Sequence, residues 1–218
     1  MGLLTGGVNY IRFRAIGDVP DALGEVYADA LAGHAFREID PYGEEERSLG
    51  WVRFDDPFVS EWAAHEIDGE DGRVVLRLRL DTLKVPEVML KAYTVAVERD
   101  RLRAAGREKL TRAEKDQVKS EVRKDLRRRS LAKMALYDIV WNLGSGEVRL
   151  FATSKTVAGL FVEAFEKTFA LKLQQLSPAV VLWMRGMVDE ELDQLAMLEP
   201  ERFHLQAGRS EPQGGDHV

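Results

Sequence analysis

Residues 74–102, VVLRLRLDTLKVPEVMLKAYTVAVERDRL, decide the fold class because their hydrophobic period changes within the stretch. Over residues 74–81 apolar and polar side chains alternate, which predicts a strand with one buried face. After Pro86 the apolar residues recur with a helical period of about 3.6. Over residues 88–102 the polar side chains are confined to a narrow stripe, so we expect a largely buried helix.

The preceding residues predict further strands and one amphipathic helix. Residues 8–15 alternate in polarity, which indicates a half-buried strand. Asp18 is placed to cap a helix that ends at Gly33. Residues 48–54 and 61–67 are two more expected strands. The N-terminal part is therefore expected to contain a β-α-β-β arrangement.

The following residues predict a long basic helical pair. Gly106 is a plausible C-terminal stop, and Thr111 with Glu114 forms a capping box that begins a second helix. Between Glu98 and Lys133 fourteen Lys and Arg residues accompany only seven Asp and Glu, a net charge of +7. Because the whole chain carries -6, the remainder carries -13. A charge separation of this kind indicates a polyanionic partner.

The second helix of the pair sorts its charges by face. At about 100° per residue, four of its cations fall within an arc of roughly 80°. These four are Arg112, Lys119, Arg123 and Arg127. Glu114, Glu121 and Asp125 lie on the opposite side, and only Asp116 lies on the basic ridge. A solvent-facing ridge of roughly 22 Å can follow a phosphate backbone, whereas the alternative is a merely solvated helix face. The candidate DNA-binding residues are Lys109, Arg112, Lys115, Lys119, Arg123, Lys124, Arg127, Arg128 and Arg129.

The C-terminal part predicts a hairpin and several helices. Residues 135–143 and 147–152 are expected strands around a Gly-Ser-Gly turn, and Ser154 caps a following helix. This β-β-α unit is followed by a helix that begins at Ser177 and by another over residues 188–198. The fold class is therefore α+β, with antiparallel sheets and packed helices.

The expected organisation has three parts that form one continuous domain. They comprise residues 1–86, residues 87–133 and residues 134–206. Residues 207–218 are rich in Gly, Ser and Pro, and we expect a disordered tail there.

Composition excludes several classes of function. The chain has no cysteine, so disulfides and thiolate-rich metal sites are excluded. No apolar run approaches the roughly 20 residues needed to cross a bilayer, and the N-terminus does not resemble a signal peptide, so we expect a cytoplasmic protein. The acidic clusters at 44–46, 55–56 and 189–191 lie beside turns or helix starts, and the four histidines lack ligand spacing. We therefore expect no catalytic site, metal, cofactor or small-molecule substrate.

Several short motifs follow one another in a recognisable order. They are SLGWV at 48–52, KVP at 84–86, GREKL at 106–110 with EK at 114–115, Lys119 and Glu121, and a hairpin leading to Ser154. Their order and spacing resemble the recombination-associated protein RdgC family over residues 8–173. The resemblance implies a bacterial nucleoid-associated protein, not an enzyme, that binds DNA with little sequence preference. It also implies ring-shaped dimers that restrain recombinase-promoted strand exchange, although typical members are substantially longer.

The expected function is non-sequence-specific DNA binding that modulates homologous recombination by occluding DNA. The expected partners are DNA, with the preference for single or double strands left open, and a second copy of the chain. The expected location is the cytoplasm, in association with the nucleoid. The alternative is a protein-interaction module whose basic helix docks on an acidic protein and does not bind DNA.

Overall fold

The computed structural model describes residues 9–19, 24–63, 67 and 72–197 of the 218-residue chain. The protein is a mixed α+β protein, which confirms the expected fold class. The residues up to Leu176 form one compact unit, and those from Ser177 onward form a second.

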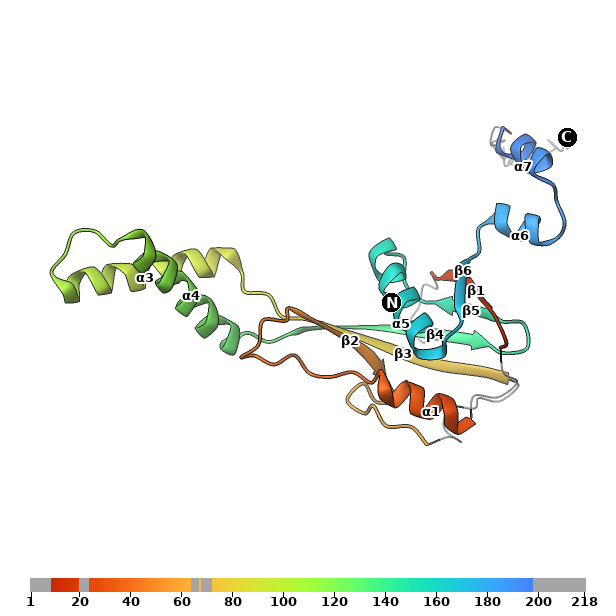
Figure 1. Ribbon diagram of the computed structural model, residues 1–218, viewed down its shortest axis with the longest axis horizontal. Coiled ribbons are helices and arrows are strands. Elements are labelled where there is room, and N and C mark those ends of the chain that lie inside the picture. Colours follow the sequence, from red (N-terminus) through yellow and green to blue (C-terminus); the bar gives the residue numbers. More distant parts are fainter. Residues whose placement is uncertain (1–8, 20–23, 64–66, 68–71, 198–218) are drawn as a thin grey trace, which may run out of the picture. The chain divides into compact units, whose positions relative to one another are not determined.

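The first unit is built around a six-stranded antiparallel sheet (Figure 1). The strands are β1 (Ile11–Ile16), β2 (Arg47–Val52), β3 (Arg73–Thr82), β4 (Lys133–Asn142), β5 (Glu147–Leu150) and β6 (Lys172–Gln175). They lie in the order β2-β3-β4-β5-β1-β6. Since β1 pairs with both β5 and β6, the N-terminal part and the β-β-α unit share one sheet.

The helices of this unit fall into two groups. Helices α1 (Gly24–Gly33) and α5 (Lys155–Phe169) pack on one face of the sheet and contribute to its core. Helices α3 (Glu87–Ala105) and α4 (Arg112–Arg129) form a helical hairpin between β3 and β4, which we call the helical pair (Figure 1). β3 and β4 pair along all ten residues of each strand, and β2 pairs with β3 up to Thr82, so the helical pair continues from the end of three paired strands.

The main core lies between the sheet and α5 and is rich in aromatic rings. Phe161, Phe165 and Phe169 recur every four residues on α5 and are buried. The Trp141 ring of β4 contacts two of them, with its centroid 5.0 Å from that of Phe165 and 5.2 Å from that of Phe169. The Trp51 indole donates to the Thr168 hydroxyl at 2.8 Å, so this buried polar group is satisfied. Alternation along β3 places Val74, Leu76 and Leu78 in the same core.

Gly50 in the middle of β2 is required by a close backbone approach. The Phe36 amide donates to the Trp51 carbonyl at 2.9 Å, and the Trp51 amide donates to the His34 carbonyl at 3.1 Å. A Cβ atom at Gly50 would lie only 2.3 Å from the Phe36 Cα. The glycine of the SLGWV motif therefore allows the segment around Phe36 to cover the edge of β2.

Two expectations about secondary structure are wrong. Residues 61–63 of the expected strand at 61–67 have no regular structure, and Ile67 is helical. Helix α3 is not largely buried, because α4 covers only one side of it. Leu90 is buried, but Val88 and Val95 are 80% and 64% exposed. Hydrophobic periodicity identified the helix correctly, but it did not reveal how little of the fold surrounds it.

The second unit contains two short helices near the expected positions. Helix α6 (Pro178–Met184) begins after Ser177, whose hydroxyl accepts from the Val180 amide at 3.2 Å. Helix α7 (Asp189–Ala196) follows Gly186, which has a φ of 92°. The expected tail at 207–218 lies outside the described residues. Within the described part of the chain, no helix combines the length and the apolar character needed to cross a membrane.

Candidate nucleic-acid interface

The first turn of α4 is fixed by an extended capping box. The Thr111 hydroxyl accepts from the Glu114 amide at 3.3 Å, and the Glu114 carboxylate accepts from the Thr111 amide at 2.7 Å. Arg107 adds an ion pair to the same carboxylate at 2.8 Å. Hydrogen bonds from Arg107 and then from Thr111 lower the pKa of Glu114 from its ordinary value of 4.5 to about 2. The connection between the two helices is therefore tied to the start of α4.

A narrow apolar seam joins the two helices. Val118, Val122 and Leu126 of α4 are buried against Leu90 of α3. Arg101 of α3 and Glu121 of α4 form an ion pair beside this seam. Because the seam uses one side of α4, the helix presents much of its remaining surface to solvent.

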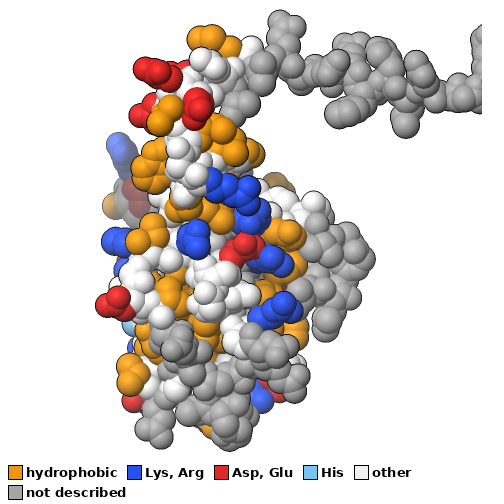
Figure 2. All heavy atoms as spheres, turned by 90° about the vertical axis from the view of Figure 1, so that its right-hand side faces the viewer, with side chains coloured by type: hydrophobic (Ala, Val, Ile, Leu, Met, Phe, Trp, Pro, Cys, Tyr) orange, Lys and Arg blue, Asp and Glu red, His pale blue; other side chains and the backbone are white. Residues whose placement is uncertain are grey.

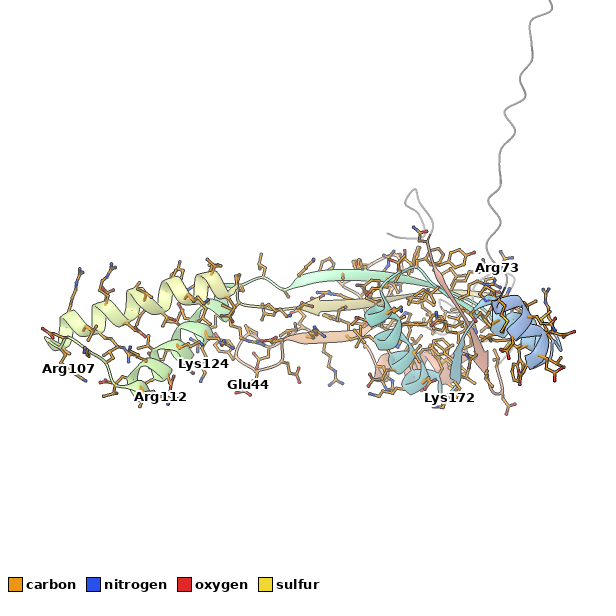
Figure 3. The ribbon with its side chains drawn as sticks, turned by 90° about the horizontal axis from the view of Figure 1, so that it is seen from above. Glu44, Arg73, Arg107, Arg112, Lys124 and Lys172 are labelled. Carbon is orange, nitrogen blue, oxygen red and sulfur yellow. The ribbon has the colours of Figure 1, made fainter. Side chains whose placement is uncertain are left out.

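Five of the predicted DNA-binding cations are exposed and have neither an ion pair nor an aromatic ring contact with a described residue. They are Lys109, Arg112, Lys115, Lys119 and Lys124. In the part of the chain that the structure describes, none has an Asp or Glu oxygen within 4.0 Å. Figure 3 shows Arg112 and Lys124 on α4, and Arg107 at the tip of the helical pair. Four of the five lie within residues 109–119, so we call that segment the basic tip.

Arg127 does not face solvent, and the expectation that it belongs to an exposed ridge is wrong. Its side chain is buried, with 8% of the residue's surface exposed. Its Nη2 atom donates to the Asp40 carbonyl at 3.1 Å and to the Glu45 carbonyl. The end of α4 lies against the acidic segment 38–46, so Arg127 anchors the helix to this segment and cannot contact a phosphate as placed.

Three further predicted cations are exposed, but each contacts a neighbouring carboxylate or aromatic ring. The Arg123 guanidinium lies 3.7 Å from the Glu87 carboxylate. The Arg129 guanidinium lies 2.8 Å from the Asp125 carboxylate. The Arg128 guanidinium stacks over the Tyr42 ring at 4.9 Å from its centroid. Their contribution to binding a polyanion is therefore expected to be smaller than that of the basic tip.

The acidic segment 38–46 lies near the end of α4 and increases the difference in charge between that end and the basic tip. It contains five Asp and Glu residues and no Lys or Arg. A cavity of about 620 Å³ lies between this segment and α4, with Glu44 and Glu46 on one side and Lys124 on the other. Figure 3 shows Glu44 beside the end of the helical pair that bears Lys124. We therefore expect the acidic segment to weaken the positive potential at this end of α4 more than at the basic tip.

A second group of exposed cations was not among the predicted DNA-binding residues. Arg12 and Arg14 of β1 and Arg149 of β5 project from the sheet face opposite α5, and all three are exposed. The alternation of residues 8–15 predicted that the two β1 arginines share a face. The sequence did not show that β5 pairs with β1, so the third arginine could not be placed beside them.

The described residues among the candidate metal ligands do not come together. In the described ranges, no three His, Asp or Glu side chains come together in a way that could hold a metal ion. The His34 Nδ1 atom lies 3.0 Å from the Ala30 carbonyl oxygen, one turn earlier on the chain.

No protein-family model matches the chain, and no curated protein shows significant sequence similarity to it. The resemblance to the RdgC family therefore stays a prediction.

Proposed function

We propose that this protein binds DNA without sequence preference and modulates homologous recombination by occluding the DNA. The observation that carries the proposal is the basic tip, where four exposed cations lie within residues 109–119 and lack ion pairs with described residues. Lysines and arginines in such a position replace condensed counterions along the phosphates. The resemblance to the RdgC family supports the recombination part of the proposal.

The arrangement favours recognition of the backbone over recognition of bases. Sequence is read by side chains that reach base edges from an element that fits a groove, and phosphate contacts carry no sequence information directly. The exposed side of α4 carries mostly charged side chains, and a ridge of charge without a defined base-reading element recognises the backbone. We therefore expect poor discrimination among sequences.

We also propose that the protein acts as a homodimer and that α3 contributes to the pairing. Val88, Met89, Tyr93 and Val95 expose apolar surface on a helix that is covered on one side only. In a twofold dimer the two subunits contact each other through the same surface, so the apolar side of α3 can pack against the same side of α3 in the second copy. Light scattering at tens of micromolar should return a dimer, and Val95→Glu should shift it toward the monomer. A monomeric wild-type protein, with and without DNA, would contradict the pairing.

The experiment that tests the function is a set of binding measurements on duplexes of unrelated sequence, each repeated over a salt series. We expect similar affinities for all of them and a steep loss of affinity with salt. A preference of about a thousandfold for one sequence at the same salt would require a base-reading element and would contradict the proposal.

Competition with polyglutamate addresses the alternative of an acidic protein partner. A protein that binds polyglutamate tightly but no DNA would favour that alternative.

A further inference from the structure

The sheet face opposite α5 carries an arrangement of charges that its own packing does not require. Arg12 of β1 lies directly opposite Arg149 of β5 in the antiparallel register. Like charges placed directly across two strands destabilise their pairing. Arg14 lies two residues further along β1, opposite Glu147. These four residues form what we call the arginine patch.

One carboxylate serves two of these guanidinium groups. The Glu147 oxygens lie 2.9 Å from Arg12 Nη2 and 2.7 Å from Arg149 Nε. Arg14 Nη2 donates to the Ser145 carbonyl at 3.4 Å. The patch therefore holds three positive charges and one negative charge, a net +2. The Arg12 and Arg149 side chains remain 46% and 47% exposed, so further acceptors can reach them.

An aromatic ring borders the arginine patch on the same face. Tyr10 precedes β1 and has the same parity as Arg12, and it is 41% exposed. Its ring centroid lies 5.5 Å from the Arg149 guanidinium carbon and 5.7 Å from the ring centroid of buried Phe151. Phe151 supports the ring from one direction, which holds it in place at the surface. Figure 2, seen from the right-hand side of Figure 1, shows Lys and Arg side chains gathered over this end of the sheet.

We propose that the arginine patch with Tyr10 is a second nucleic-acid contact and that it takes single-stranded DNA. Guanidinium groups bind phosphate oxygens in a bidentate manner, and unpaired bases stack on aromatic side chains. A duplex keeps its base faces stacked inside the helix, so only a single strand can use both Tyr10 and the arginines. The inference rests on the proposed function, since it assumes that the protein binds DNA, and it adds a distinct surface and a preferred form of DNA.

The test compares single-stranded and duplex DNA with a set of matched variants. Arg12→Gln combined with Arg149→Gln should flatten the plot of log affinity against log salt by about 1.4 for single strands, at roughly 0.7 per contact. Tyr10→Leu should weaken single-strand binding by about 5- to 150-fold, and Tyr10→Phe should retain it. Duplex binding should change little in all three variants because it depends on the basic tip.

Two controls keep the outcome interpretable. Lys155→Gln with Lys167→Gln removes the same charge from α5, which packs on the other face of the sheet, and should leave single-strand binding unchanged. Arg12→Lys with Arg149→Lys keeps both positive charges, so it should retain the salt slope. It shows whether a loss in the glutamine variant comes from the charge or from a folding defect. Wild-type single-strand affinity and slope in both the double glutamine variant and Tyr10→Leu would overturn the arginine patch and leave the proposed function standing. A wild-type protein that binds neither form of DNA would overturn the proposed function itself.

Discussion

The sheet with α1 and α5 and the helical pair are stabilised in different ways. The sheet buries a continuous core with Trp51, Trp141 and three phenylalanines of α5 at its centre. The helical pair has four buried apolar residues, all on the seam between its helices. Most of its other fixed contacts are polar: the capping box at Thr111, the Arg101–Glu121 ion pair and the Arg127 anchor.

This difference indicates a division of roles. Apolar burial supplies most of the stability of a fold, so the sheet is expected to determine global unfolding. A segment with few buried apolar contacts opens locally at a lower free energy. The helical pair also carries the basic tip and the exposed side of α3. We therefore expect the helical pair to be both the least stable region and the region that contacts the partners. Binding of a partner should then stabilise it.

The largest expected effect compares one large truncation in each region. Phe165→Ala removes a fully buried ring from the main core and should lower the free energy of unfolding by about 3–5 kcal/mol. Leu126→Ala should cost about 2 kcal/mol, and hydrogen exchange should place this loss in α3 and α4 alone. Chemical denaturation with residue-resolved exchange measures both. Equal loss of protection throughout the first unit in both variants would contradict the separation.

A second comparison concerns the buried anchor of the helical pair. Arg127→Gln removes a charged donor from two backbone carbonyls and should destabilise the end of α4 by about 1.5–3 kcal/mol. Arg128→Gln, at the neighbouring exposed position, should cost no more than about 1 kcal/mol, the value of its exposed contact with the Tyr42 ring. If the two variants were equally stable and Arg127→Gln alone weakened DNA binding, Arg127 would be a DNA contact and the structural assignment would fail.

A smaller effect concerns the acid sensitivity of the first turn of α4. The pKa of Glu114 is lowered to about 2, so the folded state favours its carboxylate. Its stabilising contribution is fully present above about pH 4.5 and is lost as the pH falls toward 2. An NMR titration should place the Glu114 midpoint near 2, and Arg107→Gln should raise it. A midpoint near 4.5 in the wild-type protein would show that the capping box does not persist in solution.

Much of the fold could be predicted because local patterns determine it. The alternation of β3, the capping box at Thr111 and the hairpin before Ser154 are signals within a few residues, and all three are confirmed. The exposure of α3 could not be predicted in this way. Hydrophobic periodicity shows which residues could be buried, but the number of neighbouring elements decides how many are.

The candidate site shows the same limit. The charge sorting on α4 correctly placed Arg112 and Lys119 at the surface. It failed at Arg127, because burial there depends on a segment about eighty residues earlier in the chain. The arginine patch likewise depends on the register between β1 and β5, which are far apart in the sequence. Contacts between distant segments carry the information that local patterns lack.

The central claim is that the basic tip of the helical pair neutralises DNA phosphates. The most direct measurement is the salt dependence of duplex binding by a variant with Lys109, Arg112, Lys115 and Lys119 all changed to Gln. The slope of log affinity against log salt should flatten by about 3 to 4, at roughly 0.9 per contact. A triple variant of Arg123, Arg128 and Arg129 to Gln should flatten it by clearly less than the roughly 2.7 of three full contacts, because these side chains already contact a carboxylate or an aromatic ring. A quadruple variant that stays folded and keeps the wild-type affinity and slope would contradict the account.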